Sequence, residues 1–533
     1  MSTKYIFVTG GVVSSLGKGL SCASIALLLE KKGLKVGMMK LDPYLNVDPG
    51  TMNPFEHGEV YVTDDGAETD LDLGHYHRFS HTELNKYSNI TSGQIYETII
   101  KKERKGEFLG KTVQVVPHIT EEIKKRICIG AETNKADVMI VEVGGTVGDI
   151  ESQPFLEAIR QFKQKFHQDC LNIHLSYIPY LKAAKELKTK PTQHSVQLLR
   201  EIGIFPEILI CRSEHALSNE IKQKISLFCN VPYEAVIEQV DVPFTIYEAP
   251  CFLHQQKLDE IICASLKLPF KPSDLKDWEQ MIQIMKTPKK ELCIGVVGKY
   301  MQHTDAYKSI FEALQHAATF HHISLNIKTF ESDKFDHNKA LDRKDLGECQ
   351  GYLIPGGFGV RGWEGKIKVA RLCREEKIPF LGICLGMQVL CVEFARHVVK
   401  LEGANSSEMD PFCLNPVISI LENQKQDINL GGSMRLGAYD CHLTKGSLAY
   451  QAYQKDKISE RHRHRYEFNN QYKEIFENQG LTVSGHYQNL CEIVELKEHP
   501  WMIGVQFHPE FKSKPLDPHP LFIDFLGACL KNG

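Results

Sequence analysis

One cysteine lies where a strand is expected to turn into a helix. The apolar run 378–383 predicts a short buried strand, residues 387–394 predict the apolar side of a helix, and Cys384 lies between them. Gly382 and Gly386 supply the small neighbours that so sharp a turn needs, and a helix N-terminus behind the sulfur favours thiolate over thiol. A buried, unreactive cysteine is the alternative interpretation. The motif therefore predicts a nucleophile on condition that a base lies nearby.

Two further segments supply the groups that such a nucleophile requires. Gln506-Phe507-His508-Pro509-Glu510 follows a strand-like run, so His508 is a candidate base and Glu510 a candidate carboxylate to orient it. Pro355-Gly356-Gly357-Phe358-Gly359 follows another apolar run, and its backbone N–H groups could form an oxyanion hole. In this order, the three segments resemble the class I glutamine amidotransferases over roughly the last 240 residues.

A glycine-rich loop near the N-terminus predicts phosphate binding. A short apolar strand leads into Gly10-Gly11-Val12-Val13-Ser14-Ser15-Leu16-Gly17-Lys18-Gly19, and a helical run follows. Backbone N–H groups and the helix N-terminus would face the anion, and Lys18 would add a charge at the outer phosphates. The loop departs from the usual spacing, because five residues separate Gly11 from Gly17 and Gly19 replaces a metal-binding hydroxyl. A purely structural turn is the alternative, but the lysine favours phosphate.

A buried carboxylate could compensate for the missing hydroxyl. Glu142 interrupts the apolar strand expected at 137–143, where a carboxylate is costly unless it is paired. Beside a phosphate loop the expected partner is Mg²⁺. The acidic segment 64–74 reads by itself as a solvated loop.

Further alternation of strands and helices predicts the architecture of the first half. Buried strands are expected at 172–178 and 206–211, with a helix over 155–166. This pattern predicts a mostly parallel sheet with ligands beyond its carboxyl ends. Between the two strands, residues 188–195 read as an extended, proline-stiffened loop with two lysines. Either it is a plain surface loop, or its cations bind a second phosphorylated ligand.

Five segments of the first half together resemble the CTP synthases. They are long and specific, and with the amidotransferase half the resemblance covers nearly the whole chain. It implies an ATP-dependent amination of UTP by ammonia drawn from glutamine. The segments are Tyr5-Ile6-Phe7-Val8-Thr9 with the glycine-rich loop, Lys40-Leu41-Asp42-Pro43-Tyr44, Asp70-Leu71-Asp72-Leu73-Gly74-His75-Tyr76, Glu142-Val143-Gly144-Gly145-Thr146-Val147-Gly148-Asp149-Ile150-Glu151 and Lys188-Thr189-Lys190-Pro191-Thr192-Gln193.

The resemblance also implies roles for individual residues. ATP would contact Ser15, Leu16, Gly17, Lys18, Gly19, Leu20, Lys40, Asp72 and Val242. Mg²⁺ would be held by Asp72 and Glu142. UTP, or CTP in its place, would contact Ser14, Asp149, Ile150, Glu151, Lys188, Thr189, Lys190, Pro191, Thr192, Gln193 and Lys224. Glutamine would contact Gly357, Leu385, Gly386, Met387, Gln388, Glu408 and Arg465, where the last two would pair with its amino and carboxylate groups.

Other family properties follow as expectations. The uracil ring would be phosphorylated at its 4-oxygen before ammonia displaces the phosphate, and ammonia would travel through an internal passage. CTP would inhibit by competing with UTP, GTP would stimulate the glutamine-driven reaction, and a homotetramer would form.

The expected fold is α/β with two domains. A P-loop-type, parallel-sheet synthetase domain is expected over 1–268, a linker over 269–291, and an α/β class I amidotransferase domain over 292–533. In the second domain, the alternating Arg and His of 461–467 could be a solvated strand face or a weak metal site.

Composition agrees with an ordinary globular enzyme. The 533 residues carry a formal net charge of −4, which gives no indication of nucleic acid or a polybasic membrane surface as a partner. The 16 cysteines are scattered without a CxxC pair, and the sequence starts without a signal-peptide pattern, so a reducing cytoplasm is expected. No apolar stretch approaches the roughly 20 residues of a membrane helix.

Other functions remain open from the sequence. One is a different amide-forming ligase of the same build, such as cobyrinic acid diamide synthase, although the loop at 188–193 favours UTP. Another is a partitioning-type ATPase switch with a degenerate amidotransferase scaffold, which would require a broken Cys–His–Glu set. Filament assembly could accompany catalysis and leaves no recognisable motif.

Overall fold

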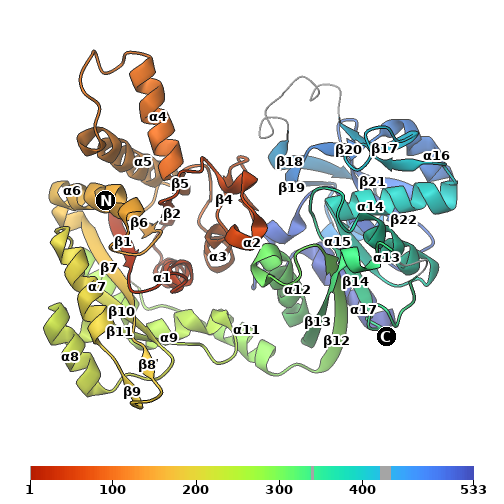
Figure 1. Ribbon diagram of the computed structural model, residues 1–533. Helices are drawn as coiled ribbons and strands as arrows, with labels where there is room; N and C mark the ends of the chain where they lie inside the picture. Colours follow the sequence, from red (N-terminus) through yellow and green to blue (C-terminus); the bar gives the residue numbers. More distant parts are fainter. Residues whose placement is uncertain (1, 270, 338–340, 421–433, 533) are drawn as a thin grey trace. The chain divides into compact units, whose positions relative to one another are not determined.

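The chain folds into two compact units. The computed structural model describes residues 2–269, 271–337, 341–420 and 434–532 (Figure 1). One unit comprises residues 1–49 and 72–282, and the other comprises 50–71 and 283–533. No helix among the described residues has the length and apolar character needed to cross a membrane.

The first unit is built on a seven-stranded sheet in which every pairing is parallel, as the sequence predicts. The strand order is β11-β10-β7-β1-β6-β2-β5. The bounds are β1 Lys4–Gly10, β2 Val36–Asp42, β5 Asn89–Thr91, β6 Val138–Val143, β7 Cys170–Tyr177, β10 Ile208–Ser213 and β11 Val236–Val240. The hairpin β8 Tyr180–Leu181 and β9 Glu186–Leu187 stands apart from this sheet.

Helices cover both faces of this sheet. The helices are α1 Lys18–Lys31, α3 Asp72–Phe79, α4 Ser92–Arg104, α5 Thr120–Thr133, α6 Gln153–Lys165, α7 Lys190–Glu201, α8 Asn219–Cys229, α9 Ala249–Gln255, α10 Leu258–Leu266 and α11 Lys276–Lys286. Phe7, Met39 and Val141 share a core with side chains of α4, α5 and α6. Because side chains alternate along a strand, α1 packs on the opposite face of β1, β2 and β6.

The second unit contains a nine-stranded sheet with a parallel half and an antiparallel half. Its order is β13-β12-β14-β15-β23-β22-β21-β18-β19, with parallel pairing from β13 to β23. The bounds are β12 Lys290–Gly298, β13 Ile323–Glu331, β14 Gly351–Ile354, β15 Phe380–Ile383, β18 Arg435–Leu443, β19 Lys457–His464, β21 Leu481–Tyr487, β22 Leu490–Leu496 and β23 Met502–Val505.

Helices and a small second sheet complete this unit. The helices are α12 Lys308–Phe320, α13 Trp363–Glu375, α14 Leu385–Phe394, α15 Leu448–Tyr453, α16 Lys473–Asn478 and α17 Pro520–Asn532. The small sheet contains β16 Ala404–Ser406, β17 Asn415–Ile420 and β20 Tyr466–Phe468. The α/β class predicted for both halves is confirmed.

Residues 50–71 belong to the second unit, although the expected boundaries included them in the first domain. This segment forms the short helix α2 Pro54–His57 and the hairpin β3 Tyr61–Val62 with β4 Glu68–Thr69. Arg461 Nε lies 2.6 Å from Asp64 Oδ1, and Arg463 Nε lies 2.7 Å from Glu68 Oε1. Ion pairs to β19 therefore hold the segment 50–71. In the expected linker over 269–291, the middle residues form helix α11.

The interpretation of residues 188–195 as an extended loop is wrong. Helix α7 begins at Lys190, with Pro191 in its first turn. Proline is well tolerated there, because the first helical residues need no N–H partner and the fixed φ suits the helix. The lysines therefore flank a helix N-terminus.

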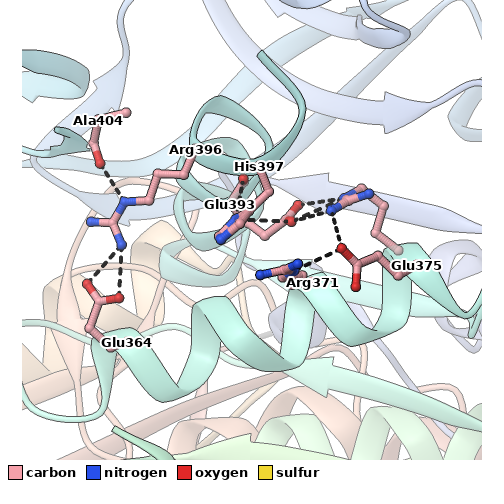
Figure 2. Close-up of polar contacts among 8 residues, drawn as sticks. Glu364, Arg371, Glu375, Glu393, Arg396, His397 and Ala404 are labelled. Carbon is pink, nitrogen blue, oxygen red and sulfur yellow. Dashed lines mark hydrogen bonds and ion pairs between the residues drawn. The ribbon is translucent and has the colours of Figure 1, made fainter. Parts of the chain in front are cut away.

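Ion pairs fix the helix that follows the candidate nucleophile. Glu393 of α14 is fully buried, and Arg374 of α13 donates to both of its carboxylate oxygens at 2.8–3.1 Å (Figure 2). Arg396, just beyond α14, binds the Glu364 carboxylate of α13 and the Ala404 carbonyl. These contacts tie the C-terminal end of α14 to α13.

Candidate active sites

Cys384 occupies the strained turn that the sequence predicts. It joins β15 to α14 with φ 52° and ψ −102°, a backbone conformation that non-glycine residues rarely adopt. A Cβ on residue 382 would lie 2.6 Å from the Gly386 carbonyl, and one on residue 386 would collide with the Ile354 carbonyl oxygen. Both flanking glycines are therefore required by close backbone approach.

The triad residues meet because β15 and β23 are neighbours in the sheet. Ile383 pairs with Val505, so the residues that follow the two strands leave the sheet side by side. His508 Nδ1 lies 2.8 Å from Glu510 Oε1. A Cβ on Gly356 would lie 2.8 Å from His508 Cε1 and 3.5 Å from Cys384 Cβ, so the glycine loop borders both.

The electrostatics favour a protonated imidazole on His508. Burial alone would lower the pKa of His508, but the Glu510 carboxylate and the Cys384 thiolate raise it to about 10. A protonated His508 stabilises the thiolate and can give its proton to a leaving amine. This arrangement is suited to attack on an amide carbon.

Replacing Glu510 by glutamine should expose this electrostatic role. Loss of the carboxylate lowers the pKa of His508, so the imidazolium loses its proton at lower pH than in the parent chain. The alkaline limb of kcat/KM for glutamine hydrolysis should therefore move to lower pH, and the rate should fall about 100-fold or more. Steady-state glutaminase assays from pH 6.5 to 10.5 measure both effects. An alkaline limb at its original pH would contradict the role assigned to Glu510.

The predicted glutamine residues surround the same turn. Gly359 N–H donates to Glu408 Oε1 at 2.7 Å, and burial raises the pKa of Glu408 while this bond and Lys299 oppose the rise. Gln388 Nε2 donates to the Tyr466 carbonyl at 3.1 Å, next to Arg465. A Cβ on Gly357 would lie 3.6 Å from Leu385 Cδ2. An acidic and a basic side chain therefore accompany the nucleophile, as an amino-acid substrate requires.

In the first unit, a neighbouring carboxylate explains why the phosphate loop has glycine at position 19. A Cβ there would collide with the Asp72 carboxylate at the start of α3, so this carboxylate fills the place where a loop hydroxyl is usual. Val12 (φ 79°) and Ser15 (φ 54°) give the loop its curvature. The buried Lys18 Nζ donates to the Gly145 carbonyl at 2.9 Å.

Two carboxylates face this loop from different elements. Lys40 of β2 and Glu142 of β6 are neighbours in the strand register. The Lys40 ammonium forms an ion pair with Asp72. Burial and then Asp72 raise the pKa of Glu142 to about 7, and Tyr76 donates a hydrogen bond to it. A divalent cation would relieve the repulsion between these carboxylates.

The donor set fits Mg²⁺ better than a closed metal site. The described residues contain no group of three or more His, Cys, Asp and Glu side chains placed to hold a metal ion. That finding includes the alternating Arg and His of 461–467, where Arg461 and Arg463 form ion pairs. Mg²⁺ commonly binds one or two carboxylates together with phosphate oxygens and water. Asp72 and Glu142 match that requirement.

Three of the predicted UTP residues, Asp149, Ile150 and Glu151, lie in a segment that adjoins the phosphate loop. Val147 N–H donates to the Gly10 carbonyl at 2.8 Å, which places the loop that carries Asp149, Ile150 and Glu151 beside it. A Cβ on Gly148 would lie 3.3 Å from Leu198 of α7.

The remaining predicted UTP residues lie on α7, just before it, or elsewhere on the surface. Ser176 donates to Thr192 at 2.8 Å, and Gln193 donates to Thr189 at 3.0 Å. Lys188 forms an ion pair with Glu186. Ser14 is exposed in the phosphate loop, and Lys224 is exposed on α8.

Sequence reasoning missed two residues that organise this unit. Arg212, at the end of β10, donates to the Leu16 carbonyl at 2.8 Å and to Asp241 at 3.0 Å, which ties the phosphate loop to the segment that carries Val242. His174 lies 2.8 Å from both Thr9 Oγ1 and Ser195 Oγ, and so links β1 to α7. Neither belongs to a motif, although the place of Arg212 at the carboxyl end of a parallel strand was a usable signal.

Comparisons with known proteins cover nearly the whole chain. The family described as CTP synthase N-terminus matches residues 4–268, and glutamine amidotransferase class-I matches residues 302–528. The CTP synthase of Protochlamydia amoebophila is 63% identical over 533 residues, covering 99% of this chain and 98% of the relative. That of Chlamydia abortus is 60% identical over the same shares. A solved glutaminase domain of Trypanosoma brucei CTP synthase with bound acivicin is 36% identical, covers 45% of this chain and 94% of that domain, and gives a TM-score of 0.43.

The chain has two candidate sites, a Cys–His–Glu set in one unit and a phosphate loop with two carboxylates in the other. Both family models match the units that carry them. Relatives that are more than half identical align with this chain over almost the full length of both proteins. The chain belongs to the CTP synthase family, enzymes that aminate UTP to CTP with nitrogen from glutamine.

Proposed function

We propose that this chain makes CTP from UTP, ATP and glutamine through a 4-phosphorylated intermediate, with ammonia passing between two active sites. The observation that carries the proposal is the buried Cys384–His508–Glu510 arrangement in a chain that also has a phosphate loop faced by Asp72 and Glu142.

Glutamine hydrolysis takes place at the turn before α14. The Cys384 thiolate attacks the side-chain amide carbon, and backbone N–H groups near Gly356 or Gly357 and at Leu385 hold the oxyanion. His508 gives its proton to the departing nitrogen, which leaves as ammonia. The acyl group remains on the sulfur as a thioester. Water, deprotonated by His508, then releases glutamate.

Glu408 and Arg465 bind the substrate's charged groups during this sequence. Their opposite charges complement the α-amino and α-carboxylate groups of glutamine. Gly386, Met387 and Gln388, together with the N-terminus of α14, line the rest of the pocket.

Amination takes place at the phosphate loop of the first unit. Backbone N–H groups of residues 15–20, with Lys18 and Lys40, bind the ATP phosphates. The γ-phosphoryl group passes to the 4-oxygen of the uracil ring, and ADP leaves. Ammonia then attacks carbon 4, and the oxygen departs with the phosphate as inorganic phosphate. Asp72 and Glu142 would hold Mg²⁺ beside the phosphates, where the cation would neutralise their charge.

Regulation and assembly complete the proposal. CTP competes with UTP for Ser14, residues 149–151, residues 188–193 and Lys224, so product inhibits its own synthesis. GTP stimulates glutamine hydrolysis, and a homotetramer forms in the presence of UTP and ATP. Ammonia moves through an internal passage, because ammonia released into water would be protonated to ammonium, which is no nucleophile.

A product assay tests the proposal directly. Purified chain with UTP, ATP, Mg²⁺ and glutamine should generate the absorbance of a cytosine ring, and omission of any one of the four should prevent it. Glutamine hydrolysis without CTP in the complete mixture, or amination of a different acceptor, would overturn the proposal. Light scattering with UTP and ATP should give the mass of a tetramer. A monomer at saturating nucleotide would overturn the proposed homotetramer.

A further inference from the structure

A lysine without a function in the scheme above is buried beside the glutamine site. Lys366 on α13 is 0% exposed, and its Nζ has no hydrogen-bond partner among the described residues. An isolated ammonium in such surroundings is unfavourable, because no partner replaces the water it has lost. A lysine in this position therefore calls for a reason other than the stability of the fold.

The geometry places this amine under the loop that borders the nucleophile. A Cβ on Gly357 would lie 3.9 Å from Lys366 Nζ and 3.6 Å from Leu385 Cδ2. The same loop borders Cys384 and His508 through Gly356. Lys366 Nζ therefore lies close to the loop whose backbone N–H groups are proposed to hold the oxyanion.

Charged side chains hold the second half of this loop, at Phe358 and Gly359. Lys299 binds the carbonyl oxygens of Phe358 and Gly359, and Glu408 accepts the Gly359 N–H. Arg361 in turn donates to the Lys299 carbonyl at 2.7 Å. Lys366 differs from these side chains because its Nζ donates no hydrogen bond to the loop among the described residues.

We propose that Lys366 is a positioning residue of the glutaminase step, which places positive charge beneath the loop 356–359 and thereby stabilises the oxyanion through its backbone N–H groups. The inference rests on the proposed function of Cys384 and extends it. Buried charge aimed at a developing oxyanion is effective, because little water is present to screen it.

The protonation of Lys366 supplies a distinctive signature. Burial, and then repulsion from Lys299, lower the pKa of Lys366 to about 7, against an opposing effect of Glu408. Arg361 and Asp336 are the other charged groups that influence it, in opposite directions. The amine is charged below this pKa and becomes neutral as the pH rises through it, so its contribution to the rate should be present at pH 6 and lost by pH 9.

The test compares Lys366→Met with the parent chain across this range. Methionine keeps the approximate shape and removes the charge, so kcat for glutamine hydrolysis should fall about tenfold at pH 6, less than for loss of an oxyanion-hole hydrogen bond. KM should change little. The ratio of parent to variant kcat should approach one at pH 9. Taking this ratio cancels the titration of His508, which the two chains share.

Lys368→Met is the matched control. It removes the same charge from the same helix, but Lys368 donates to the Phe335 and Asp336 carbonyls and not toward the glycine loop. Its kcat should match the parent at every pH. Thermal unfolding of Lys366→Met should show an unchanged or higher Tm, because the variant removes a desolvated amine.

The outcomes separate this inference from the proposed function. A ratio that stays constant with pH, or a loss of activity that accompanies a lowered Tm, would show that Lys366 is merely structural and would overturn the inference alone. Glutaminase activity retained by Cys384→Ala would instead overturn the proposed nucleophile.

Discussion

Cys384→Ala should lose glutamine-driven CTP synthesis and keep synthesis from added ammonium chloride. The substitution removes the sulfur with little change in volume, so the turn before α14 should persist. Without a nucleophile no thioester forms, and the glutamine-driven rate should fall by about three orders of magnitude or more. Added ammonia bypasses this step, so its rate should stay near that of the parent chain.

The measurement compares both nitrogen sources at mildly alkaline pH, where more free ammonia exists. Lys18→Ala is the opposite control, because loss of the phosphate-loop lysine should prevent CTP formation from either source. GTP should accelerate only the glutamine-driven reaction of the parent chain. An ammonia-driven rate that falls as far as the glutamine-driven rate would show that Cys384 is structural or that the two reactions are not separable.

Asp72→Asn and Glu142→Gln should each abolish CTP synthesis from both nitrogen sources and spare glutamine hydrolysis. The place usually filled by a loop hydroxyl is filled by the Asp72 carboxylate against Gly19, and Glu142 faces the same loop from β6. Loss of either charge weakens the binding of Mg²⁺, so the charge on the phosphates is less well neutralised during transfer. The loss should be about 1,000-fold or greater, comparable with removal of other charges that stabilise phosphoryl transfer.

Ring amination and glutaminase assays on the same preparations provide the measurement, with Mg²⁺ varied over a wide range. Glu132→Gln, which removes an exposed carboxylate from α5, is the matched control and should retain the parent rate. Near-normal CTP formation in Asp72→Asn or Glu142→Gln would refute the metal assignment. A loss of glutaminase activity of similar size would point to a folding defect.

The sequence alone determined the local features of both sites. A sharp turn needs glycines at fixed offsets, so the strand, Cys384 and helix of the second unit could be predicted from residues a few positions apart. The phosphate loop is equally local, because strand, glycines, lysine and helix follow one another directly. The parallel sheet of the first unit followed from the alternation of buried strands and helices.

Only the tertiary structure decided what joins distant segments. His508 lies beside Cys384 because β23 pairs with β15, and the Asp72 carboxylate fills the space against Gly19 because α3 packs on α1. Residues 50–71 join the second unit through ion pairs to β19, and Lys366 lies beneath Gly357 without any motif to mark it. Periodicity and spacing report the forces between residues that are close in the sequence. These contacts depend instead on which strands and helices lie next to one another in the folded chain.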